Sequence, residues 1–103
     1  MLTVIETDEF IATAGAFWNE EQREEFVNFI AANPDAGDVI PGSGGLRKVR
    51  WAAKGHGKRG GARVIYFLRS SRGEVILVTA YNKGRVENIP AHLLRKLMEK
   101  HNV

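Results

Sequence analysis

The chain has 103 residues, of which 44% are hydrophobic and 26% are charged, and it contains no cysteine. This length suits one domain with a modest core, and the composition argues against disorder. The sequence offers no disulfide or thiolate metal site, no signal peptide and no apolar run that could span a membrane, so we expect a cytoplasmic protein without a cofactor.

The charge is divided unevenly along the chain. Residues 1–45 contain nine acidic side chains and one basic one, whereas residues 46–103 contain fourteen basic and three acidic ones. The two parts therefore carry about −8 and +11 charges. A charge distribution of this kind steers a polyanion toward one face, which favours a nucleic-acid partner.

The acidic part predicts a short strand at residues 2–5 and then a helical hairpin. Asp8 is a candidate cap for the first helix, whose apolar side chains are Phe10, Ile11, Ala14 and Phe17. The second helix begins with a capping box of Asn19 and Gln22 and ends near Asn33, because Pro34 disfavours helical geometry in the residue before it. Its apolar stripe consists of Phe26, Phe29 and Ile30.

The basic part predicts three strands and a helix after a glycine-rich loop at residues 35–45. The strands are residues 46–52, 62–69 and 74–81, with a hairpin turn at residues 70–73. A final helix over residues 90–100 would direct inward Leu93, Leu94, Leu97 and Met98. The prediction is an α+β fold, a single domain over residues 1–103, with an antiparallel sheet covered on one face by helices.

Period-two alternation divides the side chains of these strands between two faces. Lys48 and Arg50 fall on one face of the first strand, and Arg47 and Trp51 on the other. Arg63 opens the next strand on the face opposite that of Ala62, Val64 and Tyr66.

The segment of residues 44–67 has the densest positive charge. It contains no acid, and its basic residues are Arg47, Lys48, Arg50, Lys54, Lys58, Arg59 and Arg63. Its glycines let the backbone approach a phosphate closely and leave N–H groups to bind it. A Walker phosphate-binding loop is excluded, since no GK[ST] motif follows four spacer residues.

The stretches LRKVRW, KGHGKRGG, GGARVIYF and VTAYNK, taken together, resemble the RelE/ParE toxin superfamily, and within it the HigB-type RelE toxins. The resemblance covers essentially the whole chain and implies a helical hairpin on an antiparallel sheet. It also implies a type II toxin that cuts mRNA on the ribosome without metal, by attack of the 2′-hydroxyl on the adjacent phosphate. The implied partners are the ribosome, mRNA and a cognate antitoxin, expected to be a small helix-turn-helix protein.

The same resemblance assigns roles to residues of the basic part. The catalytic candidates are Lys48, Arg50, Arg63, Tyr81 and Lys83. The charge of residues 44–67 adds Arg47, Lys54, Lys58 and Arg59 as candidates for RNA binding, and Arg85 joins them because it lies close to a basic position of the family, shifted by one. No histidine spacing resembles a metal site.

Two questions stay open at the level of sequence. Several members of the family have a tyrosine near the C-terminus, where this chain has Leu, Met and His101, so Lys48, Tyr81 and His92 all remain candidates for the general base. The alternatives to a nuclease are a ParE-like toxin that poisons gyrase and a non-catalytic RNA-binding relative. The cluster of Lys and Arg argues against the first, and the missing tyrosine is the reason to keep the second.

Overall fold

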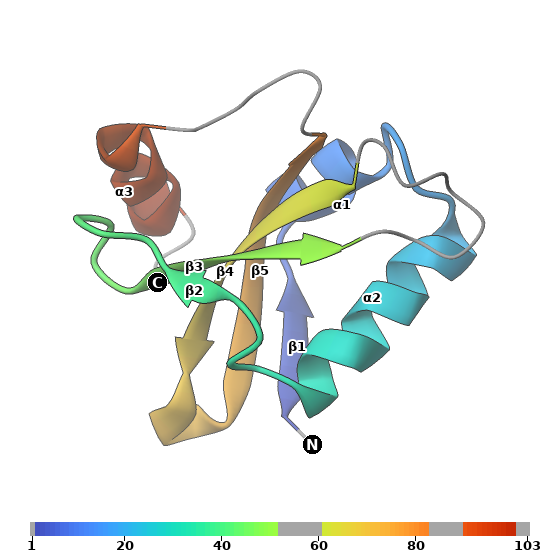
Figure 1. Ribbon diagram of the computed structural model, residues 1–103, viewed down its shortest axis with the longest axis horizontal. Coiled ribbons are helices and arrows are strands. Elements are labelled where there is room, and N and C mark those ends of the chain that lie inside the picture. Colours follow the sequence, from blue (N-terminus) through green and yellow to red (C-terminus); the bar gives the residue numbers. More distant parts are fainter. Residues whose placement is uncertain (1, 52–60, 83–89, 101–103) are drawn as a thin grey trace.

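The computed structural model describes residues 2–51, 61–82 and 90–100 and confirms the predicted α+β class (Figure 1). Its helices and strands follow one another in this order: β1 Thr3–Glu6, α1 Asp8–Ala14, α2 Glu20–Ala32, β2 Asp38–Val39, β3 Leu46–Trp51, β4 Ala62–Arg69, a 3₁₀ turn Ser70–Arg72, β5 Glu74–Asn82 and α3 Ala91–Lys100. No helix among the described residues is long and apolar enough to cross a membrane.

The five strands form one sheet in the order β1-β5-β4-β3-β2. Strands β2 to β5 are antiparallel, as predicted, but β1 pairs in parallel with β5, so the sheet is mixed. The short strand β2 lies within residues 35–45, which the sequence predicts to be loop. A strand of two residues is too short to show an alternating pattern in the sequence. Only its pairing with β3 identifies it as a strand.

Helices cover both faces of the sheet, not one face as predicted (Figure 1). One core lies between the sheet and the α1–α2 hairpin and includes Phe10, Phe26 and Tyr66. The second core lies under α3, where Leu94 packs with Ile65 and other apolar side chains of the sheet. The physical reason is strand β5, which is buried from Val75 to Tyr81 and therefore needs apolar cover on both sides.

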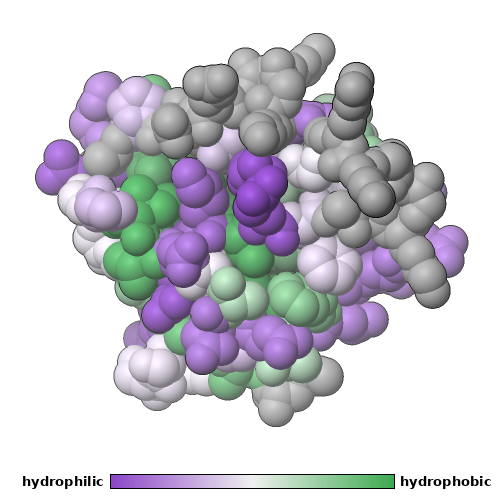
Figure 2. Space-filling model, viewed as in Figure 1, coloured by the Kyte–Doolittle hydropathy of each residue, from purple (hydrophilic) through white to green (hydrophobic). Residues whose placement is uncertain are grey.

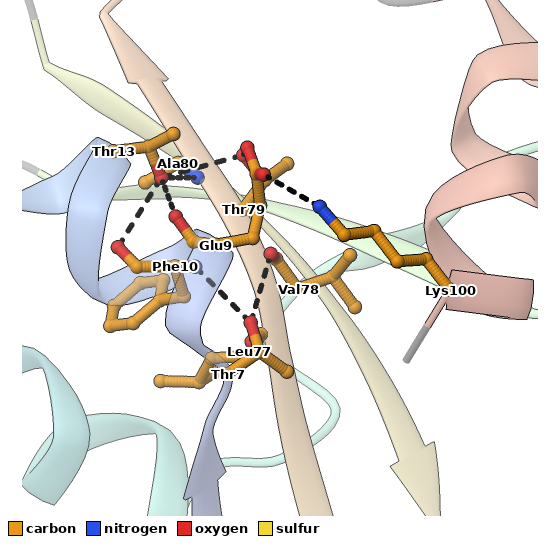
Figure 3. Close-up of polar contacts among 9 residues, drawn as sticks. All are labelled: Thr7, Glu9, Phe10, Thr13, Leu77, Val78, Thr79, Ala80 and Lys100. Carbon is orange, nitrogen blue, oxygen red and sulfur yellow. Dashed lines mark hydrogen bonds and ion pairs between the residues drawn. The ribbon is translucent and has the colours of Figure 1, made fainter. Parts of the chain in front are cut away.

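The helical hairpin is capped at both of its N-termini. Thr7, and not Asp8, caps α1: its Oγ1 accepts from the Phe10 N–H at 3.1 Å and donates to the Leu77 carbonyl at 2.7 Å (Figure 3). The same hydroxyl therefore caps the helix and ties it to β5. The predicted capping box of Asn19 and Gln22 is confirmed, with hydrogen bonds of 2.8 and 2.9 Å.

A buried group of hydrogen bonds fixes β2 against β3. The Gly37 N–H donates to Tyr66 Oη at 2.9 Å, and Tyr66 donates to the Pro34 carbonyl at 2.7 Å. Arg47 Nη1 donates to the Gly37 carbonyl at 2.7 Å. A Cβ atom at position 37 would lie 2.8 Å from the Lys48 carbonyl oxygen, so only glycine fits this close approach.

Helix α3 packs on the sheet with its apolar side and forms an ion pair with α1. Leu94 is fully buried and Leu97 half-buried, whereas Leu93 is 43% exposed and does not point inward as predicted. The Met98 side chain lies outside the described part of the structure. At the end of the helix, Lys100 Nζ lies 3.9 Å from Glu9 Oε1 on α1 (Figure 3).

Candidate nucleic-acid interface

Three of the residues that the sequence nominates for catalysis form a row across the sheet. Arg50 on β3 pairs with Arg63 on β4, and Arg63 pairs with Tyr81 on β5. Directly paired residues of antiparallel strands project from the same face, with Cβ atoms about 4.5–5.5 Å apart. We call these three residues the arginine–tyrosine row.

Lys48 lies one row away on the same face. It pairs with Ile65 on β4, which in turn pairs with Thr79 on β5. Arg50 is exposed, and Lys48 and Arg63 are half-buried. In Figure 2, strongly hydrophilic side chains gather near the middle of the view, beside hydrophobic ones, over the part of the sheet that Figure 1 draws there. Val49 and Trp51 pack in the core against the α1–α2 hairpin, whereas Leu46 packs in the core under α3, which confirms the predicted division of β3 into two faces.

The facing pair of arginines is unfavourable for folding. Like charges directly opposite each other on neighbouring strands destabilise a sheet by a few tenths of a kcal/mol to about 1 kcal/mol. Among the described residues, neither Arg50 nor Arg63 forms an ion pair that would offset this repulsion. An anion between the two guanidinium groups would turn this repulsion into attraction, which is the physical reason to regard the row as a phosphate site.

Tyr81 completes the row as a buried phenol. Its side chain is 8% exposed and packs in the core under α3. Burial raises its pKa above the ordinary value, and the neighbouring charge of Arg63 offsets part of that rise. At neutral pH Tyr81 therefore keeps its proton and offers a hydrogen-bond donor, not a phenolate.

Arg63 is tied to the backbone next to its own strand. Its Nη1 donates to the Gly61 carbonyl at 3.2 Å. This bond uses one of the five guanidinium N–H groups and leaves the others for a ligand.

The structure places Arg47 on the face of β3 opposite to that of Lys48 and Arg50. Arg47 pairs with Tyr66, so it lies on the α1–α2 face, where it donates to the Gly37 carbonyl. Its role is to hold the chain before β2, and we leave it out of the proposed interface.

The remaining nominated residues lie on other segments. His92 is exposed on α3. Five nominated residues lie outside the described parts of the chain, namely Lys54, Lys58, Arg59, Lys83 and Arg85.

The sequence interpretation missed one polar residue on this face. Asp38 on β2 pairs directly with Lys48 on β3, so its carboxylate projects from the same face as the row. That Asp38 lies on this face follows only from the pairing of β2 with β3. Within the described residues, no group of three or more His, Cys, Asp or Glu side chains could hold a metal ion.

No protein-family model matches the chain. Among solved structures, it is similar to a mutant of the E. coli toxin RelE in the free state, with a TM-score of 0.61 and 11% sequence identity. The match covers 99% of this chain and 98% of the RelE chain. At this identity the similarity establishes the architecture, and the chain has a RelE-like fold.

Proposed function

We propose that the protein is the toxin of a type II toxin–antitoxin system and a ribosome-dependent endoribonuclease that cuts mRNA without a metal ion. The observation that carries this proposal is the arginine–tyrosine row, where Arg50, Arg63 and the protonated Tyr81 are paired across three neighbouring strands and project from one face. The RelE-like fold supports the same function, and the resemblance of LRKVRW, KGHGKRGG and GGARVIYF to HigB-type toxins is in keeping with it. We expect the protein to act in the cytoplasm and to be neutralised by a small antitoxin.

The cleavage step needs charge stabilisation at the phosphate. When the 2′-oxygen attacks the adjacent phosphorus, the phosphorane gains negative charge and the bond to the 5′-oxygen breaks. Arg63 and Arg50 would each offer a planar fork of N–H groups to the phosphate oxygens. Preorganised donors of this kind stabilise the transition state more than the ground state.

Two protons also have to move in this reaction. Tyr81 stays protonated because it is buried, so we propose that it donates a hydrogen bond or a proton toward the leaving 5′-oxygen. Lys48, one row away on the same face, is the residue we propose to accept the 2′ proton. His92 is less suited to either role, because it is exposed on α3 and not on the sheet.

The function is tested by incubating the protein with a defined mRNA, with and without ribosomes, and by mapping the new ends. The proposal predicts cuts only with ribosomes, leaving a 2′,3′-cyclic phosphate and a 5′-hydroxyl, and equal cleavage when EDTA is present at a level that leaves ribosomes intact. Arg63→Ala should abolish the cuts. Arg72→Ala is the matched control, since Arg72 is an exposed arginine in the turn between β4 and β5.

Other outcomes would point to other functions. Growth arrest without RNA cleavage, together with trapped gyrase–DNA complexes, would support a ParE-like toxin. Binding to ribosomes without cleavage, by a wild-type protein shown to be folded, would support a non-catalytic RNA-binding relative.

A further inference from the structure

We propose that Asp38 reads a guanine base of the mRNA next to the cleavage site, and so sets part of the sequence preference of the enzyme. This inference rests on the proposed function, and it concerns a residue for which the cleavage chemistry has no use. Asp38 is exposed on the edge strand β2, directly across from Lys48.

Asp38 lies within reach of a strand of RNA that is held by the arginine–tyrosine row. Asp38 pairs with Lys48 on β3, and Lys48 pairs with Ile65 on β4. Arg50 and its partner Arg63 lie two residues further along these strands, so Asp38 is two strands and two residue positions away from Arg63. With strands about 4.8 Å apart and a rise of about 3.3 Å per residue, the two backbones are roughly 12 Å apart. One strand of RNA can contact both residues, while the carboxylate stays away from the scissile phosphate.

The position of Asp38 is fixed by its neighbour in the chain. Both the N–H and the carbonyl of Gly37 are hydrogen-bonded, to Tyr66 and Arg47, and there is no room for a side chain at Gly37. The residue that follows therefore enters the sheet in a defined register. A side chain carried by a strand of fixed register can discriminate between ligands, which a residue on a loose loop does poorly.

The charge of Asp38 indicates which part of the RNA it meets. Cations on the same face attract phosphates, whereas a carboxylate repels them and only accepts hydrogen bonds. At this position a base edge with N–H donors is therefore favoured over the backbone. Single-stranded RNA is recognised in this manner, through the Watson–Crick edges of unstacked bases.

Guanine is the base whose edge fits a carboxylate best. Its N1–H and N2–H groups are adjacent and parallel, so the two oxygens of one carboxylate can accept both. Adenine and cytosine offer one amino group beside an acceptor nitrogen, and uracil offers one N–H between two carbonyl oxygens. Each of these three bases would place an acceptor against the negative charge.

The experiment compares guanine with inosine, which lacks the 2-amino group. Ribosomes are programmed with mRNAs that carry one or the other base at each of the three positions of the A-site codon, and the single-turnover cleavage rate is measured. The variants are Asp38→Asn and Asp38→Ser. The control is Asp35→Asn, which removes the same charge from an exposed position in the segment between α2 and β2. Circular dichroism establishes that each variant is folded.

We expect wild type and Asp35→Asn to cut the guanine substrate at least about tenfold faster at one position, since one hydrogen bond to a charged group is lost with inosine. Asp38→Asn and Asp38→Ser should reduce this ratio to within about twofold. The inference is overturned if wild type cuts both substrates equally, or if the Asp38 variants keep the ratio. A uniform increase in rate with both bases would also overturn it, because the carboxylate would then only repel the strand. Absence of any cleavage by wild type would contradict the proposed function itself.

Discussion

Arg63 lies directly across the sheet from Tyr81, and its charge offsets part of the rise in pKa that burial imposes on the phenol. This relationship gives the two residues complementary tasks in the proposed reaction. The guanidinium attracts the phosphate, while the phenol remains a proton donor at neutral pH.

The ionisation of Tyr81 can be measured directly, because the chain has only two tyrosines, Tyr66 and Tyr81. Burial raises the pKa of both above the ordinary value of about 10. Carbon-13 NMR of labelled tyrosine should show two late titrations, assigned with Tyr81→Phe. In Arg63→Gln the pKa of Tyr81 should rise further, because the offsetting charge is gone. A Tyr81 midpoint at or below 10 would contradict this account.

The same shifts predict how stability depends on pH at the alkaline end. Because folding favours the neutral phenols, their contribution to stability is complete below about pH 10, the unfolded pKa, and is lost as the pH rises through the folded pKa values. The midpoint of urea unfolding should therefore fall above pH 10, and it should fall less steeply in Tyr81→Phe. An equal slope in both proteins would show that Tyr81 is not the cause.

Replacing Arg50 should separate function from stability. Arg50→Gln removes one of two like charges that face each other, so the free energy of unfolding should stay the same or increase by up to about 1 kcal/mol. The cleavage rate should nevertheless fall about 10-fold to 100-fold, since one donor to the phosphate is lost. Chemical denaturation and the ribosome cleavage assay measure the two effects. A clear loss of stability would mean that Arg50 supports the fold, and not a ligand.

Replacing Tyr66 should lower the stability of the fold, in contrast to replacing Arg50. Tyr66→Phe leaves the buried Gly37 N–H without its hydrogen bond and the Pro34 carbonyl with one donor fewer, which should cost about 1–3 kcal/mol of stability. Tyr81→Phe is the matched control, and its cost should be smaller. Urea unfolding measures the free energy of unfolding of both variants. Equal losses of stability would show that the hydrogen bonds around Gly37 do not hold β2 in place.

The helical hairpin and the two faces of β3 could be predicted from local signals. Asn19 and Gln22 form the capping box that their spacing indicates, and alternation places Lys48 and Arg50 on one face. Features that depend on distant partners could not be predicted. Thr7 replaces Asp8 as the cap because its hydroxyl also bonds the Leu77 carbonyl, 70 positions away in the sequence.

The same limit applies to the candidate site. Arg63 and Tyr81 were nominated by resemblance, but only the register of β4 and β5 places them side by side. Asp38 was missed because β2 has two residues and no pattern of its own. Arg47 was nominated by its charge, although strand alternation already places it on the opposite face.

Binding to ribosomes should weaken steeply with salt if cations of the sheet contact phosphates. Each contact with single-stranded RNA contributes about −0.7 to the slope of log affinity against log salt concentration. Arg50→Gln should therefore make the slope shallower by about 0.7, whereas Arg72→Gln should leave it unchanged. Filter binding over a range of potassium concentrations measures the slopes. Identical slopes in wild type and Arg50→Gln would remove Arg50 from the interface.

The claim that the arginine–tyrosine row holds the scissile phosphate is tested most directly by single-turnover cleavage at saturating ribosome concentration. The account predicts that Arg63→Ala lowers this rate by about 100-fold or more and changes the affinity for ribosomes by no more than about threefold. Arg72→Ala should match wild type in both quantities. A folded Arg63→Ala variant that cuts bound mRNA at the wild-type rate would contradict the claim.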